Sequence, residues 1–402
     1  MTVPEPRDPR AARIATALVL SGGGARGAYQ AGVLRGLLDL GLLRDESRVD
    51  VVVGASAGAL NGAALAAFVD RPQEGVATVE RLWSNIEPQQ VFRTDVRSLG
   101  GIGARWVRDL SFGGVLRHVA PKSLLDTAPL RALIAEHIRF ERIDANVESG
   151  ALRAFAIPAT NLYTADGVFF VDARSDVPLW RRGRFSVERS RIRAEHLMAS
   201  SAIPVFFPSV EIEGRHFGDG SIRNTAPLSP AIHLGAERIV AIGVRRAGLP
   251  AEKAVAGRRA PPTIAQIAGA LLDAVMLDAI EVDVEHSDRV NASVLGCATG
   301  NPRAPFRWVD VLWLYPSCGF AKIAAELADH IPAVVRYLMR GLGPDDATSE
   351  LTSYLLFDAV YCGRLIEIGR ADVQARRDEI LSFFAQPPAS ERLREPVSGS
   401  GR

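Results

Sequence analysis

The stretch ATALVLSGGGARGAYQAGVLRGLLDLG (residues 15–41) sets the fold class. Its apolar run, residues 15–20, stops at a cluster of glycines, and residues 28–40 then carry apolar side chains at helical spacing. The same order returns at residues 49–69, where VDVVV leads into GASAG and then into an Ala- and Leu-rich helix. Two successive strand–turn–helix units predict an α/β fold, with a mainly parallel sheet covered by helices.

Outside these units the pattern predicts further strands and a helical C-terminal part. The expected strands are residues 152–159, 167–172, 210–212, 238–244 and 310–315. Helices are expected over most of residues 76–138, as one long amphipathic helix at 264–285, and as several helices within 320–385. We therefore expect disordered tails at 1–13 and 386–402, an α/β domain at 14–245, a linker or loop at 246–263, and a mostly helical region at 264–385 packed on that domain.

Composition limits the class of protein. The chain has 402 residues, 48% of them hydrophobic and 23% charged, which is typical of a globular protein with a sizeable core. Its 47 basic and 46 acidic residues leave no overall field that would attract nucleic acid. Cys297, Cys318 and Cys362 are widely spaced, and no apolar run is long enough for a signal peptide or a membrane span. These features favour a cytoplasmic location.

The first glycine cluster, residues 22–27, has the G-x-G-x-x-G spacing of dinucleotide-binding loops. That function needs an acidic residue at the carboxyl end of the second strand to bind the ribose. Here the second strand ends in Gly54-Ala55-Ser56, and Asp50 lies at its other end. A dinucleotide site is therefore disfavoured. No Lys-Ser/Thr pair follows Gly27, which excludes a Walker-type phosphate loop.

The second turn, GASAG at residues 54–58, is a G-x-S-x-G sequence between a strand and a helix, the context of a nucleophile elbow. Ser56 is the candidate nucleophile, although a small-residue helix start with Ser56 as an ordinary cap has the same letters. A nucleophile here would give Gly22, Gly23 and Gly24 a role, because their backbone N–H groups could face a developing oxyanion at the same sheet edge.

A serine nucleophile needs a base. The seven histidines are His118, His137, His196, His216, His233, His286 and His330, and those in expected helices are more typical of packing or surface positions. They show no metal-ligand spacing, so no metal or other cofactor is expected. Asp219 lies between Gly218 and Gly220 after a short strand and is the better candidate, although an Asp-Gly pair alone is also a common hairpin turn.

Four blocks of sequence together resemble the patatin-like phospholipases across about residues 14–244. They are SGGGARG (21–27), GASAGALN (54–61), ASSAIP (199–204) and DG (219–220). The segment TSYLLFD (352–358) is also similar to the tails of bacterial members. The family usually has Asp-Gly-Gly or Asp-Gly-Ala where this chain has Asp-Gly-Ser, which keeps the carboxylate and changes the turn after it.

The resemblance implies a three-layer α/β/α fold and a Ser56–Asp219 dyad without histidine. It also implies an oxyanion hole from the loop at residues 22–24 and hydrolysis of lipid acyl esters. The residues that support these motifs are Arg26, Gly27, Gly54, Gly58 and Gly220. For Arg26 two roles stay open, attraction of a lipid phosphate or pairing with a carboxylate that ties the loop down.

We therefore expect a serine esterase of phospholipase A or lysophospholipase type that works through an acyl-enzyme. An acyltransferase with the same acyl-enzyme and a non-catalytic lipid-binding regulatory protein remain alternatives. The expected partner is a lipid or acyl-ester substrate. The Arg-rich stretch at 180–193, with Trp180 and Phe185, is compatible with transient peripheral membrane contact, although its composition is more typical of a solvated face or loop. Residues 99–119 are either a cover over the acyl pocket or a core loop.

Overall fold

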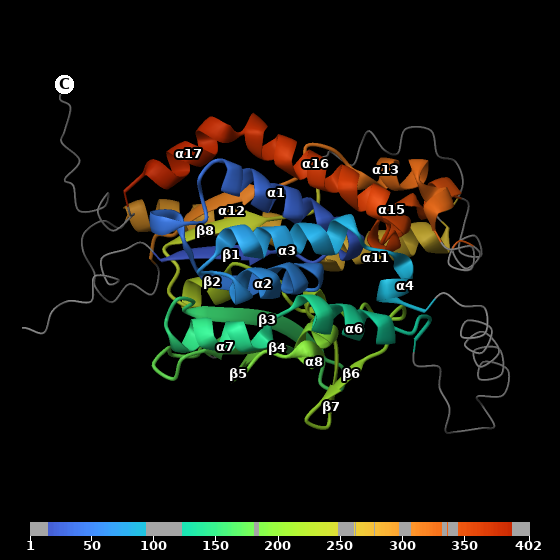
Figure 1. The fold of residues 1–402 in the computed structure, drawn as a ribbon, viewed down its shortest axis with the longest axis horizontal. Coiled ribbons are helices and arrows are strands. Elements are labelled where there is room, and N and C mark those ends of the chain that lie inside the picture. Colours follow the sequence, from blue (N-terminus) through green and yellow to red (C-terminus); the bar gives the residue numbers. More distant parts are fainter. Residues whose placement is uncertain are drawn as a thin grey trace, which may run out of the picture.

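The computed structural model describes residues 15–93, 123–180, 185–247, 261, 263–276, 278–296, 307–331, 336 and 345–387. Its centre is a nine-stranded, mostly parallel sheet with helices on both faces (Figure 1). The predicted α/β/α class is therefore confirmed. The expected tail at 1–13, the segment at 99–119, most of the expected linker and nearly all of the expected tail at 386–402 lie outside the described residues.

The sheet brings strands from both ends of the sequence together. The strand order is β5-β4-β3-β2-β1-β8-β9, and the β6–β7 hairpin joins β3 through β7. The strands are β1 (Thr16–Leu20), β2 (Val49–Gly54), β3 (Ala154–Asn161), β4 (Gly167–Ala173), β5 (Phe185–Arg189), β6 (Val210–Ile212), β7 (Arg215–Asp219), β8 (Arg238–Ile242) and β9 (Asp310–Leu314). β1 pairs in parallel with β2 and β8, whereas β3 pairs antiparallel with β4 and β7. The loops after β1 and β2 consequently meet at one edge.

The helices cover both faces. They are α1 (Ala28–Asp39), α2 (Ala57–Ala67), α3 (Pro72–Ser84), α4 (Pro88–Val91), α6 (Ala128–His137), α7 (Phe140–Glu148), α8 (Ala194–Ser200), α9 (Ser229–His233), α11 (Ile264–Met276), α12 (Asp278–Gly296), α13 (Phe320–Glu326), α15 (Asp345–Leu355), α16 (Ala359–Ala375) and α17 (Arg377–Ala385). The single helix expected at 264–285 is wrong, because α11 and α12 are separate helices. They pack on different partners, α11 on α15 and α12 beside β9.

The C-terminal helices share the main hydrophobic core with the first helix. α1 lies along α16 (Figure 1), and Tyr354, Tyr361 and Val373 are buried in the same cluster as the side chains of α1. The helices approach closely at Gly32, where a β-carbon would lie 1.9 Å from the carbonyl oxygen of Ile366. A smaller cluster fills the opposite face of the sheet, toward α9 and α12. Both ends of the described chain therefore stabilise the sheet.

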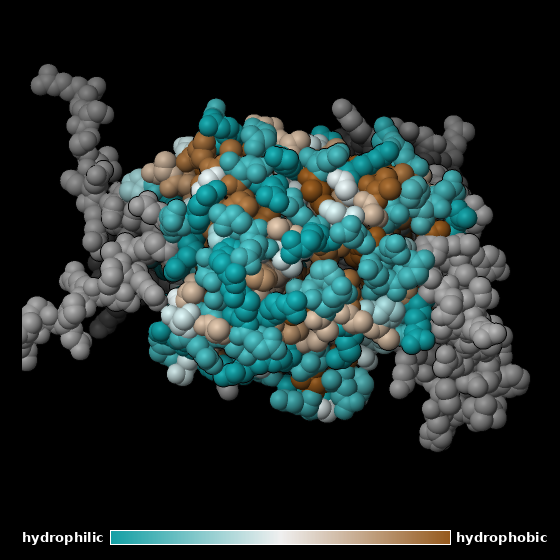
Figure 2. Space-filling view, viewed as in Figure 1, coloured by the Kyte–Doolittle hydropathy of each residue, from teal (hydrophilic) through white to brown (hydrophobic). Residues whose placement is uncertain are grey.

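The surface over α1, α2 and α3 is mostly hydrophilic, and apolar residues appear on it in small separate groups (Figure 2). Scattered apolar residues of this kind are normal on protein surfaces. Among the described helices, none is both long enough and apolar enough to cross a bilayer.

Candidate active site

Ser56 occupies the sharp turn between β2 and α2. Its backbone has φ 52° and ψ −122°, a conformation that non-glycine residues rarely adopt and that costs of order 1–3 kcal/mol. The turn is held from outside, because the Ser56 N–H donates a 3.1 Å hydrogen bond to the hydroxyl of Ser200 at the end of α8. Such strain at a strand–helix turn is the geometry of a nucleophile elbow.

The glycines of the sequence motifs lie where there is no room for a side chain. At Gly27, Gly54, Gly58 and Gly220 the nearest atom to an added β-carbon would be 2.1–2.6 Å away. At three of these positions that atom is a backbone oxygen, which does not move aside easily. These glycines therefore set the close packing of the turns around Ser56.

Asp219 ends β7 and is fully buried. Its Oδ1 accepts a 2.8 Å hydrogen bond from the Ser221 N–H, whereas Oδ2 has no hydrogen-bond partner within the described part of the chain. Burial raises the pKa of Asp219 to about 6. The Ser221 N–H and the hydroxyls of Ser56 and Ser221 act in the opposite direction and lower this pKa. The structure thus brings the Ser56 hydroxyl and the Asp219 carboxylate together.

The glycine loop between β1 and α1 passes directly beside this pair. A β-carbon at Gly22 would lie 3.2 Å from Cβ of Ser56. Gly24 has φ 56°, and a β-carbon there would lie 2.3 Å from the carbonyl oxygen of Tyr354, so the position requires glycine on both counts. Among the described residues, the backbone N–H groups of Gly23 and Gly24 have no hydrogen-bond partner. The loop that passes beside the serine consequently carries two unpaired donors.

Arg26 points from the same loop into the C-terminal helices and is 3% exposed. Its guanidinium forms ion pairs with Glu350 and with Asp273 (3.4 Å), and its Nε donates a 2.8 Å hydrogen bond to Ser353. It also lies 4.0 Å from the centre of the Tyr354 ring. The structure therefore places Arg26 as a tie between the loop and α11 and α15.

A buried polar chain that sequence reasoning missed connects the two loops. Trp83 Nε1 donates to Asn61 Oδ1 (2.7 Å), and Asn61 Nδ2 donates to Gln30 Oε1 (2.9 Å) and to the Gly27 carbonyl (3.1 Å). Gln30 in turn donates to the Ser21 carbonyl (2.9 Å). Asn61 was part of the family resemblance, but nothing local in the sequence pairs it with Gln30 or Trp83. Ser200 was missed in the same way.

An apolar pocket opens on one side of Ser56, and the space in it and in front of it that atoms do not fill is about 400 Å³. Gly24 and Ser56 line this pocket, and its other lining residues come from α2, α3, α4, α6 and the segments after α3, α8 and α15. Trp83 stacks on Phe357 within this wall, with ring centres 6.4 Å apart. The pocket suits a hydrocarbon chain better than a polar group.

Four of the histidines have partners elsewhere. His137 bonds to the Leu133 carbonyl, His196 to the Arg193 N–H, His216 to Ser209, and His330 to Asp358. Within the described ranges, no group of three or more His, Cys, Asp or Glu side chains is placed to hold a metal ion.

A strained serine at a strand–helix turn of an α/β sheet, beside unpaired backbone donors and an apolar pocket, is the architecture of a serine acyl hydrolase. The family model "Patatin-like phospholipase" matches residues 18–232, more than half of the chain. The chain therefore belongs to the patatin-like phospholipases, a family of lipid acyl hydrolases. No curated protein sequence matches it significantly.

Solved structures similar to this chain include VipD from Legionella pneumophila, which is 13% identical with a TM-score of 0.32. That match covers 88% of this chain and 67% of VipD. Human GIVD cytosolic phospholipase A2 is 12% identical with a TM-score of 0.41, and the match covers 94% of this chain and 63% of the human one. The chain thus spans about two thirds of the length of either structure.

Proposed function

We propose that this protein is a lipid acyl hydrolase of phospholipase A or lysophospholipase type, in which Ser56 is the nucleophile and Asp219 the base. One observation carries the proposal. The Ser56 hydroxyl lies close enough to the buried Asp219 carboxylate to lower its pKa, and Oδ2 of that carboxylate has no hydrogen-bond partner in the described residues. Ser56 also lines an apolar pocket. An acyl chain in this pocket would present its ester carbonyl to Ser56.

The raised pKa makes Asp219 a usable base. With a pKa of about 6 the carboxylate is mostly charged at neutral pH, yet it is more basic than an ordinary aspartate. Ser56 Oγ attacks the acyl carbon while its proton passes to Asp219. The Gly23 and Gly24 N–H groups, together with the N-terminus of α2 at Ala57, stabilise the oxyanion. The protonated Asp219 then delivers the proton to the departing alcohol or lysolipid.

The contacts of the arginines indicate which of them are available to bind a lipid phosphate or an anionic membrane. Arg26 is already paired with two carboxylates and is therefore not the site of a lipid phosphate in this proposal. Arg191 and Arg193 pair with Glu148 and Asp144, and Arg189 bonds to backbone carbonyls. These three arginines do not form an uncompensated basic surface. A transient membrane contact and a cytoplasmic location stay predictions.

The test compares wild type with Ser56→Ala and Asp219→Asn on mixed phospholipid and lysophospholipid vesicles, with products read by mass spectrometry. We expect fatty acid release by wild type alone, and labelling of Ser56 by a fluorophosphonate in wild type. Labelling with acyl transfer to an added alcohol, and no fatty acid release, would make the protein an acyltransferase. If folded wild type is neither labelled nor active but binds the vesicles, the catalytic proposal is wrong and a lipid-binding function replaces it.

A further inference from the structure

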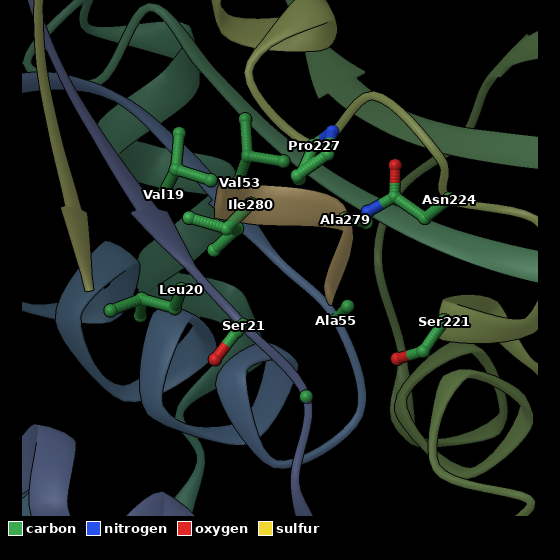
Figure 3. Close-up of a pocket in the computed structure, with 11 residues that line it drawn as sticks. Val19, Leu20, Ser21, Val53, Ala55, Ser221, Asn224, Pro227, Ala279 and Ile280 are labelled. Atoms are coloured by element: carbon green, nitrogen blue, oxygen red, sulfur yellow. The ribbon is translucent and has the colours of Figure 1, made fainter. Parts of the chain in front are cut away.

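A second pocket adjoins the candidate active site on the other face of the sheet. It lies at the carboxyl ends of β1 and β2, and Ala279 and Ile280 at the start of α12 cover it (Figure 3). Ser221 and Asn224, from the turn after Asp219, form one wall, and Ala55 lies opposite them. This pocket has a polar wall, whereas the one on the α2 side is lined almost entirely by apolar side chains.

The two polar side chains in this wall lack partners. Ser221 is 6% exposed and Asn224 is 7% exposed. In the part of the chain that the structure describes, neither Ser221 Oγ nor Asn224 Oδ1 forms a hydrogen bond, although the Ser221 hydroxyl lies near enough to Asp219 to lower its pKa. Buried polar atoms are nearly always paired with protein or with an ordered small molecule, because leaving them unpaired is costly. The pocket has room for a water molecule, and two such groups are enough to hold one.

This wall continues directly into the dyad. A β-carbon at Gly22 would lie 2.5 Å from Ser221 Oγ and 3.2 Å from Cβ of Ser56, so the small Gly22 separates the two serines. Ser221 is also joined to the base, because its N–H donates to Asp219 Oδ1. A hydroxyl compound bound at Ser221 would therefore lie near both the acyl group on Ser56 and the carboxylate that must take its proton.

We propose that this second pocket is the acceptor subsite of the acyl-enzyme, in which Ser221 and Asn224 hold the water that releases the fatty acid. The inference rests on the proposed function. The water oxygen forms a bond to the acyl carbon and its proton passes to Asp219. The bond between that carbon and Ser56 Oγ then breaks, and Asp219 returns the proton to Ser56. The acyl chain and its acceptor thus occupy opposite faces of the sheet.

The experiment separates acylation from deacylation. A p-nitrophenyl ester is turned over at saturation, the reaction is quenched in acid, and the fraction of protein acylated at Ser56 is read by intact mass. Asn224→Ala removes one group that holds water, and Ala279→Leu narrows the pocket from α12 without changing the dyad. In both variants we expect deacylation to slow about tenfold, which for Asn224→Ala is the usual effect of one lost hydrogen bond. The acylated fraction should rise, with fluorophosphonate labelling unchanged.

Two further measurements sharpen the test. Ser287→Ala is the control, because it removes a buried hydroxyl from α12 about 12 Å along the helix from Ala279. We expect its deacylation rate and its acylated fraction to equal those of wild type. Adding methanol gives the acyl-enzyme a second acceptor, and the ratio of methyl ester to free fatty acid then reports the choice between methanol and water. Because methanol is larger than water, Ala279→Leu should lower the ratio of methyl ester to free fatty acid.

The outcomes are distinguishable. Wild-type hydrolysis and acylation with no change in Asn224→Ala or Ala279→Leu, both shown to be folded by thermal unfolding, would overturn the acceptor subsite and leave the proposed function intact. Absence of any adduct at Ser56 in wild type, with fluorophosphonate or ester, would overturn the proposed function itself. A slower fluorophosphonate reaction in both variants would show that the pocket serves acylation, which also contradicts the inference.

Discussion

The backbone N–H of Ser56 donates its hydrogen bond to the hydroxyl of Ser200, a residue 144 positions further along the chain. Ser200 is the last residue of α8 and is completely buried. Because the backbone of Ser56 is strained, its conformation persists only where neighbouring structure holds it. α8 therefore helps to fix the direction of the proposed nucleophile from outside the elbow.

We expect Ser200→Ala to lower the free energy of unfolding by about 1–2 kcal/mol, since a buried N–H loses its acceptor. It should also lower kcat more than it changes KM, because the hydroxyl of Ser56 loses its orientation. Denaturant unfolding and ester hydrolysis measure the two effects. Ser201→Ala is the matched control for stability, because Ser201 Oγ has no partner among the described residues. An equal loss of stability in both variants would contradict the role given to Ser200.

The second prediction concerns the pH dependence of activity. In the proposed mechanism Asp219 must be charged to accept a proton from Ser56, and its pKa is about 6. We expect the acylation rate, measured as kcat/KM for a neutral ester, to rise with pH, reach half of its maximum near pH 6 and level off above pH 7. Half-maximal activity near pH 4 would mean that the carboxylate is not desolvated in the working enzyme.

The third prediction is that the burial of Asp219 lowers the free energy of unfolding at neutral and higher pH. Asp219 has a folded-state pKa above its unfolded value of 3.8, so between these values the native state binds more protons than the unfolded state. The contribution of this residue to stability is therefore present below pH 3.8 and is lost as the pH rises through 6. A shift of this size corresponds to about 3 kcal/mol. Asp219→Asn should be more stable than wild type at pH 8, and the difference should shrink toward pH 4 in thermal unfolding.

The fourth prediction tests the glycine loop. Gly24→Ala should lose nearly all activity and destabilise the protein, because the methyl group meets the Tyr354 carbonyl and the φ of 56° is unfavourable for alanine. Gly214→Ala in the β6–β7 turn is the control, since it has φ 73° but no atom within 4 Å of the added carbon. Gly214→Ala should lower the free energy of unfolding by about 1 kcal/mol, because only its backbone conformation is unfavourable for alanine. Equal losses would show that contact with Tyr354 is unimportant.

The fifth prediction concerns the contacts by which Arg26 holds the glycine loop to α11 and α15. Arg26→Met should lower the free energy of unfolding by about 2 kcal/mol, because Asp273 and Glu350 lose their buried counter-charge while both remain partly exposed to water. Adding Glu350→Gln should restore part of this loss, because it relieves the repulsion with Asp273. A double-mutant cycle measures the coupling. Simple additivity of the two changes would mean that the ion pair contributes nothing.

Local pattern was sufficient to predict the two strand–turn–helix units, because each is signalled within about twenty residues by an apolar run, glycines and helical spacing. It missed β5, whose side chains are mostly half-exposed and lie in an Arg-rich stretch. It also did not predict that β3 pairs antiparallel with β4 and β7. Pairing between distant strands depends on tertiary packing, and the sequence of a single strand does not show which strand it pairs with or in which direction.

In the candidate site, too, local sequence predicts some residues, whereas others can be found only from the three-dimensional structure. Ser56 stands in a motif that can be read locally, whereas Asp219 was singled out among ordinary Asp-Gly turns mainly through the family resemblance. Ser200 and the buried chain through Gln30, Asn61 and Trp83 connect segments far apart in sequence. Their side chains are common polar and aromatic types, and only their positions in three dimensions show that they support the two loops.

The packing of α1 against α16 has a consequence for synthesis. α1 is made early and α16 late, so the glycine-lined side of α1 has no helix to contact until Ala375 has left the ribosome. At 5–20 residues per second, translation from Ile242 to Ala375 takes on the order of ten seconds. Until β9 has been made the nascent chain exposes the unpaired edge of β8, and until α16 has been made it exposes apolar surface on α1.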